Sequence, residues 1–154
     1  MVPVTQVIPF GEEDLILEHG RIARQANASI LATQGGTVVL VAAVSDDHPR
    51  EGLDFFPLMV DYRERFYAAG KFPGGFFKRE ARPGDLETLK ARMIDRSIRP
   101  LFAKGFQHET QIYVQILSTD GEHPAETMAL TAARFGLRLG SSSSSLFFSW
   151  PARP

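Results

Sequence analysis

The chain has 154 residues, of which 44% are hydrophobic and 23% charged, with a formal net charge of −1. This usage is that of an ordinary soluble domain with a sizeable core, and it excludes a disordered or collagen-like chain. Cysteine is absent, which excludes a disulfide framework and a thiolate metal site.

The sequence does not predict a membrane association. The longest apolar stretch without a charge, 26–45, is broken by Asn27 and by Thr33 to Gly36, so it predicts two strands and a turn rather than a transmembrane helix. Residues 1–14 lack the basic start and continuous apolar core of a signal peptide. We therefore expect a cytoplasmic protein.

The first third of the chain predicts β-structure. Strands are expected at 15–18, 28–33 and 37–44, the last two joined by a hairpin at Gln34-Gly35-Gly36. Because 37–44 is nearly all apolar, we expect that strand to be buried on both faces and to end before 46–49. A further strand is expected at 56–62, before a loop rich in Gly, Phe and basic residues at 71–83.

The clearest helix is predicted at 85–99. Pro83-Gly84 precedes it, Asp85 can cap it, and Pro100 ends it. The helical spacing of three apolar side chains predicts that they form a buried stripe: Leu86, Leu89 and Met93. The spacing of three cations places them on one face, away from that stripe: Arg92, Arg96 and Arg99.

A strand at 111–118 and a helix at 124–133 complete the pattern, and residues 134–140 could prolong that helix. The order β-β-β-β-α-β-α predicts an α+β fold with a mixed sheet. Residues 141–145 are all serine, and an aromatic cluster follows them. Such a tail contributes little to a packed core. We therefore expect a partial domain at 1–133 and a divergent tail, not native to the fold, at 134–154.

Charge is distributed unevenly along the chain. Residues 1–60 carry three Arg against eight acids, or −5, and residues 61–104 carry eleven Lys or Arg against six acids, or +5. A basic block of this kind fits an anionic ligand, although a salt-bridged surface gives the same count.

The chain shows little sign of a metal or phosphate-loop site. Its four histidines are scattered, with none at helical ligand spacing, and no Gly-rich loop joins a strand to a helix in a nucleotide-binding pattern. We assign no catalytic or metal-binding residue.

The most distinctive segment is Phe76-Phe77-Lys78-Arg79, on a Gly-containing loop. Adjacent aromatic rings can stack on bases while cations bind phosphates, so the segment suits single-stranded nucleic acid. Alternatively, the phenylalanines anchor the loop in the core and the cations are solvated. Arg92, Arg96 and Arg99 could extend the same basic surface, or could form a solvated face paired with Asp95 and Glu87.

Several linked segments resemble the first core domain of bacterial polynucleotide phosphorylases, in one order and from about residue 8 to 133. They are 52–58, Tyr62-Arg63-Glu64-Arg65, Tyr67-Ala68-Ala69-Gly70, 76–80, and 87–102. The resemblance implies a ribonuclease PH-like fold and a phosphorolytic 3′-to-5′ exoribonuclease that cleaves RNA with inorganic phosphate and releases nucleoside diphosphates.

The resemblance also implies partners and site residues. Family members use Mg²⁺ and form homotrimeric rings, and an RNA-degradation complex is possible. In them, the aromatic rings and cations corresponding to Phe76, Phe77, Lys78 and Arg79 bind RNA in the ring's channel. We add Arg82 and the three helix arginines as candidates. Lys78 stands where Arg is common, which keeps the charge and loses the planar guanidinium.

The departures from the family concern catalysis. Family phosphorolysis is attributed to a second core domain, whose phosphate- and metal-binding residues are absent from these 154 residues. A frameshift or truncation after about residue 133 would explain the abrupt change economically, and a genuine splice or fusion would look the same from sequence. We therefore expect a fragment that supplies RNA guidance and ring assembly, binds no Mg²⁺ and is inactive alone. The alternatives are a non-catalytic RNA-binding or scaffold protein and a complete small ribonuclease PH, which the missing second half disfavours.

Overall fold

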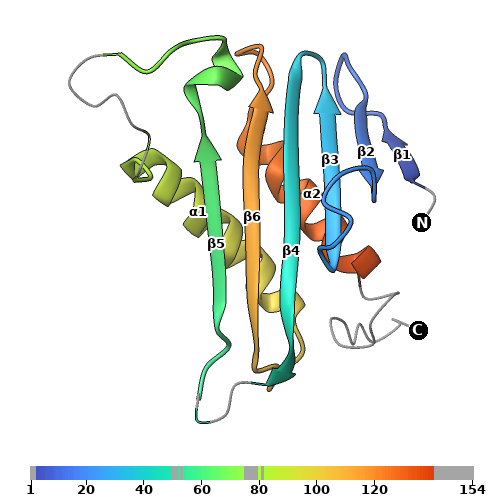
Figure 1. The fold of residues 1–154 in the computed structure, drawn as a ribbon. Helices are drawn as coiled ribbons and strands as arrows, with labels where there is room; N and C mark the ends of the chain where they lie inside the picture. The colour runs from blue at the N-terminus through green and yellow to red at the C-terminus, as the bar shows by residue number, and fades with distance from the viewer. Residues whose placement is uncertain (1–2, 50–51, 53, 75–79, 81, 141–154) are drawn as a thin grey trace.

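A computed structural model describes residues 3–49, 52, 54–74, 80 and 82–140. Six strands form one sheet, and two α-helices cover one of its faces (Figure 1). The strands, in chain order, are β1 (Val4–Ile8), β2 (Leu15–His19), β3 (Ala28–Gln34), β4 (Thr37–Pro49), β5 (Leu58–Glu64) and β6 (His108–Ser118). The helices are α1 (Asp85–Ile98) and α2 (Ala125–Gly140), with short 3₁₀ turns η1 (Phe66–Ala69) and η2 (Arg99–Leu101).

The sheet is mixed, as the sequence predicts. Its order is β1-β2-β3-β4-β6-β5, and the pair β5–β6 is parallel while the other neighbours are antiparallel. Joining two parallel strands requires a crossover, which α1 provides by lying against β5. The carboxyl ends of β5 and β6 therefore meet at one end of the sheet, beside η1 and the start of α2 (Figure 1).

The core lies between the sheet and the helices. One side of each central strand is buried there, for example Val39 and Val41 of β4 and Ile112 and Val114 of β6. Helix α2 crosses β3 and β4, and Gly136 sits directly on Ile30, where an added Cβ would lie 3.0 Å from the Ile30 side chain. A small residue thus allows the helix to approach the sheet closely.

Most predicted elements are confirmed, with shifted ends. The hairpin that joins β3 to β4 has the predicted turn, in which Gly35 has a φ of +53° and Gln34 pairs with Thr37. Strand β1 was not predicted, because its short run of residues 4–8 has no turn signal before it. Strand β4 was expected to end before 46–49 but runs to Pro49, because β6 continues to pair with it as far as His108.

Two burial predictions are wrong. Strand β4 is not buried on both faces: alternate residues are half-buried, and Val44 is 50% exposed, because both helices cover the same side of the sheet. The stripe of Leu86, Leu89 and Met93 is also exposed, at 72%, 62% and 44%. The buried face of α1 instead carries Ile94 and Ile98.

The ends of the helices follow from local chemistry. The N-cap of α1 is Gly84, whose backbone amide donates a hydrogen bond to the Glu87 side chain in the first turn at 2.6 Å. The predicted cap at Asp85 is therefore wrong, because Asp85 is already the first residue of the helix. Helix α2 continues through the possible extension at 134–140, where Leu137 is buried. Of the tail predicted at 134–154, the remaining residues 141–154 lie outside the described part of the chain.

Candidate functional site

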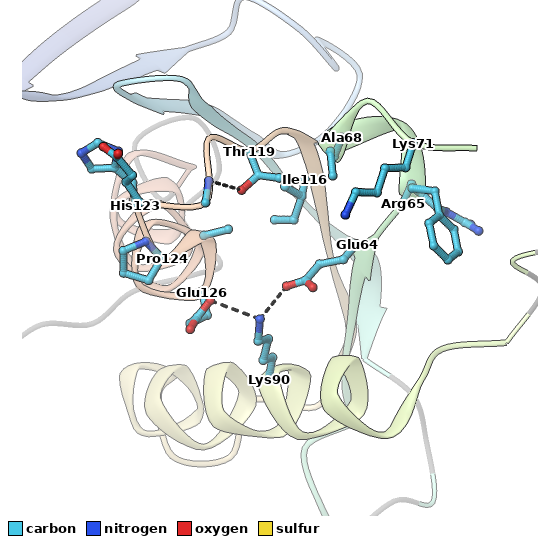
Figure 2. Close-up of a pocket in the computed structure, with 15 residues that line it drawn as sticks. Glu64, Arg65, Ala68, Lys71, Lys90, Ile116, Thr119, His123, Pro124 and Glu126 are labelled. Carbon is cyan, nitrogen blue, oxygen red and sulfur yellow. Dashed lines mark hydrogen bonds and ion pairs between the residues drawn. The ribbon is translucent and has the colours of Figure 1, made fainter. Parts of the chain in front are cut away.

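A cleft of about 590 Å³ lies where the carboxyl ends of β5 and β6 meet the two helices (Figure 2). Its walls come from η1, from the first half of α1, and from the loop that joins β6 to α2. This is the end of the sheet at which the parallel strands stop. Charged side chains from β5, α1, α2 and the connections between the elements converge there. The polar lining residues include Glu64, Lys71, Lys90, His123 and Glu126.

Lys90 of α1 closes one side of the cleft by joining two carboxylates. Its Nζ atom lies 2.6 Å from Glu64 Oε1 at the end of β5 and 3.3 Å from Glu126 Oε2 in the first turn of α2 (Figure 2). Buried Tyr62 donates its hydroxyl to Glu64 at 2.6 Å. We call Tyr62, Glu64, Lys90 and Glu126 the charge network; it connects β5, α1 and α2.

The environment favours the charged forms of Glu64 and Lys90, while burial raises the pKa of Tyr62 and keeps its hydroxyl protonated. Desolvation acts to raise the pKa of Glu64, but hydrogen bonds from Lys90 and Tyr62 outweigh it and lower that pKa below its ordinary value. Desolvation likewise opposes the charge of Lys90, and the hydrogen bond to Glu64 outweighs it and raises the pKa of Lys90. Neither group therefore exchanges a proton near neutral pH, so this part of the cleft is suited to holding elements together rather than to acid–base chemistry.

Asp120 organises the opposite wall. Its carboxylate accepts hydrogen bonds from the amides of Gly36, Glu122 and His123 at 2.9–3.0 Å, and from the side chains of Thr37 and His123 at 2.8 and 2.7 Å. The backbone amide and the ring of His123 are the main cause of a strongly lowered pKa for Asp120, and Asp120 in turn raises the pKa of His123. The loop between β6 and α2 is thereby fastened to the β3–β4 turn.

The rim of the cleft is more basic. Lys71 follows η1 and extends toward the cleft (Figure 2). Arg65 lies beside it, and its guanidinium is 3.8 Å from a carboxylate oxygen of Glu80. Of these two cations, Lys71 makes no ion pair with any residue that the structure describes.

The predicted RNA-binding residues divide into three groups. Phe76, Phe77, Lys78 and Arg79 lie outside the described residues. Arg82, Arg92 and Arg96 are exposed, and within the described part of the chain none of them pairs with a carboxylate. Arg92 and Arg96 line a shallow depression with Leu89 and Met93, so the predicted separation of arginines from the apolar stripe is wrong: the two share one face of α1.

Arg99 does not join Arg92 and Arg96. Its guanidinium lies 2.8 Å from Asp95 Oδ1 and donates a hydrogen bond to the backbone carbonyl of Phe56 at 2.9 Å. The central carbon of the guanidinium lies over the Phe56 ring, 5.5 Å from the ring centroid. The pairing with Asp95 that the sequence left open is therefore present for Arg99. Glu87, the other expected partner of the arginines, instead binds the amides of Gly84 and Glu64.

Sequence reasoning proposed no role in a site for Glu64, Lys90 or Glu126. Glu64 and Lys90 are 26 residues apart, and no local spacing links them. Only the crossover between β5 and α1 brings them together. Among the described residues, no group of three or more His, Asp or Glu side chains is placed to hold a metal ion.

Comparisons with known proteins agree on the fold. Residues 12–140 match the family model described as the 3′ exoribonuclease family, domain 1. Among solved structures, the rice (Oryza sativa) Rrp46 structure has a TM-score of 0.55 at 16% identity and covers 91% of this chain and 56% of its own. The Archaeoglobus fulgidus exosome with RNA bound to the active site has a TM-score of 0.52 at 20% identity, covering 87% and 50%. The ribonuclease PH-like fold is thus confirmed.

Curated relatives are closer in sequence. The polyribonucleotide nucleotidyltransferase of Magnetococcus marinus is 53% identical over 135 residues, and that of Anaeromyxobacter sp. (strain K) is 46% identical over 139 residues. These matches cover 88% and 90% of this chain but 19% of each relative, so the chain spans about a fifth of their length. No helix in the described part of the chain is long and apolar enough to cross a membrane.

Proposed function

The chain belongs to the 3′ exoribonuclease family, matching the first domain of that family, and on this premise we propose that it is part of a phosphate-dependent 3′-to-5′ exoribonuclease in which it contacts RNA. The observation that carries this proposal is the identity of about half of its residues to polyribonucleotide nucleotidyltransferases over nearly the whole chain. The fold neighbour with RNA bound to its active site is consistent with a nucleic acid as the ligand.

In the proposed reaction, an oxygen of inorganic phosphate attacks the phosphorus of the terminal phosphodiester. The 3′-oxygen of the preceding nucleotide leaves and takes a proton, and a nucleoside diphosphate is released. We assign this chemistry to another part of the enzyme, because the surroundings of Glu64 and Lys90 lower the pKa of the first and raise the pKa of the second, which holds both in their charged forms. Mg²⁺, if the whole enzyme uses it, is assigned no ligand among the described residues.

The proposed role of this chain is to bind single-stranded RNA. Lys78 and Arg79 would bind backbone phosphates while Phe76 and Phe77 stack on bases. Arg82, Arg92 and Arg96 are free of carboxylate partners within the described structure and would extend the same basic surface. Arg99 is a weaker candidate because Asp95 and two backbone carbonyls occupy its guanidinium.

The wider setting follows from the same family. We propose a homotrimeric ring in the cytoplasm, with inorganic phosphate as co-substrate and an RNA-degradation complex as the larger assembly. The specific alternative is a non-catalytic RNA-binding protein, which the ion pairs of Lys90 with Glu64 and Glu126 and of His123 with Asp120 favour for the chain taken alone.

Two measurements test whether this chain binds RNA while another part of the enzyme carries out phosphorolysis: binding of a single-stranded oligoadenylate, and phosphate-dependent release of nucleoside diphosphate from it. The chain alone is expected to bind the RNA but release no diphosphate. Replacing Lys78 and Arg79 together by alanine should lower the slope of log affinity against log salt by about 1.4, or 0.7 per phosphate contact on a single strand. Diphosphate release by the pure chain, or an unchanged slope, would contradict the corresponding part of the proposal.

A further inference from the structure

Three parts of the chain meet above Gly35, in the turn between β3 and β4. An added Cβ there would lie 2.6 Å from Glu13 Oε2, 2.7 Å from His123 Cε1 and 2.9 Å from Asp120 Oδ2. Glu13 belongs to the connection between β1 and β2, while Asp120 and His123 belong to the loop between β6 and α2. A glycine, with a φ of +53° and no side chain, allows these groups to meet at this point.

The contacts within this group differ in kind. Asp120 holds the turn by accepting hydrogen bonds from the Gly36 amide at 2.9 Å and from the Thr37 hydroxyl at 2.8 Å. It also accepts a hydrogen bond from the His123 ring at 2.7 Å. The Glu13 carboxylate makes no hydrogen bond with any residue that the structure describes, so only charge draws it to the group.

The proton on the His123 ring therefore decides how firmly the group is held. Three carboxylates face the ring: Asp120 and Glu122 from its own loop, and Glu13 from the connection between β1 and β2. The hydrogen bond to Asp120 is the main cause of the raised pKa of His123, and the charge of Glu13 adds to it. Once neutral, the ring can still donate through Nδ1, but it no longer offsets Asp120 and Glu13, which then repel each other across Gly35.

We propose that Glu13, Asp120 and His123 form a pH-sensitive latch on the wall of the cleft. With the His123 ring protonated, the latch holds the β1–β2 connection and the β3–β4 turn against the loop that leads into α2. Loss of that proton releases Glu13 and loosens the turn. Because His123 and Pro124 line the cleft on the side away from Lys71, the latch fixes the shape of that wall (Figure 2). The latch operates without RNA, so it is independent of the proposed function.

The direction of the pH dependence follows from the raised pKa of His123. The latch is fully formed below the ordinary value of 6.5 and opens as pH rises through the raised value. Asp120 has a strongly lowered pKa, so its carboxylate stays charged in mildly acidic solution. The latch is therefore closed in mildly acidic solution and opens on the alkaline side of 6.5.

Nuclear magnetic resonance of the full chain, with isotopically labelled histidine rings and backbone amides, tests the latch between about pH 5 and pH 9. The first readout is the midpoint at which the His123 ring titrates, which should lie above 6.5. Glu13→Gln removes a carboxylate that faces the ring and should lower that midpoint. Glu12→Gln is the matched control, because it removes the same charge from the neighbouring exposed residue and should leave the midpoint in place.

The second readout is hydrogen exchange of the Gly36 amide, which is bonded to Asp120. Its protection, relative to an unfolded peptide at the same pH, should fall as pH rises through the His123 midpoint. The fall should reach up to about tenfold for each pH unit by which that midpoint exceeds its ordinary value, because the proton is linked to closing. His123→Asn keeps an N–H donor without a charge, so protection in this variant should stay constant over the same range. Circular dichroism shows whether each variant retains the fold.

The outcomes decide for or against the latch. A His123 midpoint above 6.5 that Glu13→Gln lowers, together with Gly36 protection that falls through it, supports the latch. A midpoint at or below 6.5, equal midpoints in Glu13→Gln and Glu12→Gln, or protection that does not change with pH overturns it. The same pH dependence in His123→Asn would assign the effect to another group and also overturns it. If His123→Asn does not fold, the midpoints and the protection measured in the other proteins decide.

Discussion

The two faces of α1 carry similar side chains in very different states. On the inner face, Lys90 is paired with two carboxylates, and Ile94 is completely buried. On the outer face, Arg92 and Arg96 have no carboxylate partner among the described residues, and Leu89 is 62% exposed. The inner face therefore contributes to stability, while the outer face has cations and apolar surface available for a ligand.

The largest difference in stability between the two faces should appear when one apolar residue on each face is replaced by alanine. Ile94→Ala removes a side chain with no exposed surface and leaves a cavity between α1 and the sheet, so we expect it to lower the free energy of unfolding by about 2–4 kcal/mol. Leu89→Ala should change it by no more than about 0.5 kcal/mol. Urea unfolding followed by circular dichroism measures both, and equal losses would mean that Leu89 is buried after all.

The sequence contains both apolar stripes of α1, but it does not say which one meets the sheet. The stripe of Leu86, Leu89 and Met93 lies roughly a third of a turn around the helix from Ile94 and Ile98. Helical periodicity identifies an amphipathic segment, whereas the direction of the crossover from β5 decides which stripe is buried. The hairpin at Gly35-Gly36 was predictable because its signal is local, as were the limits of α1.

A smaller loss is expected when the inner charge is removed. Lys90→Met keeps most of the aliphatic stem but leaves Glu64 and Glu126 without their shared cation. We expect about 1–2 kcal/mol less stability, below the value for a fully buried pair because Lys90 is 28% exposed. Arg92→Met is the matched control on the outer face and should stay within about 0.5 kcal/mol. Similar losses in both variants would show that the ion pairs of Lys90 add nothing.

RNA binding should depend on Arg92 and Arg96, which have no carboxylate partner in the described structure, more than on Arg99, which is paired with Asp95. Replacing Arg92 and Arg96 together by alanine should lower the salt slope of binding by up to about 1.4, with little change in stability. Arg99→Ala should leave the slope unchanged and slightly destabilise the fold, because Arg99 is committed to Asp95 and Phe56. Anisotropy titrations with the oligoadenylate at several salt concentrations distinguish these results. If only Arg99→Ala reduced the salt slope of binding, the RNA would instead have to contact the chain near η2.

The candidate site was predictable only in part. As with the buried stripe of α1, local patterns are visible in the sequence, but the tertiary contacts that decide their role are not. Segment 76–79 and the basic block at 61–104 were visible as local composition. A count of charges does not tell a cation that is paired from one that has no partner among the described residues. Lys90 and Arg92 are two positions apart and contribute equally to the +5. Their different states come from Glu64 and Glu126, which only tertiary contacts bring to Lys90.

The smallest effect concerns how the stability of the inner face depends on pH. Glu64 has a lowered pKa in the folded chain, so its contribution is complete above its ordinary value of 4.5 and is lost as pH falls through the folded value. In Lys90→Met, desolvation acts on Glu64 with only Tyr62 left as a side-chain donor, so the lowering shrinks. The difference in unfolding free energy between the original chain and Lys90→Met should therefore narrow as pH falls below 4.5.

Urea unfolding of both proteins between neutral pH and the acid limit of the folded state measures this difference. Asp120 also has a lowered pKa, and its contribution likewise disappears in acid. However, Asp120 is bonded to Thr37, Gly36 and His123 on the opposite wall of the cleft, so it contributes equally to both proteins and cancels. A difference that stays constant with pH would mean that Lys90 stabilises α1 through the contact of its Nζ atom with the Tyr62 ring, 5.6 Å from the ring centroid, rather than through its ion pair with Glu64.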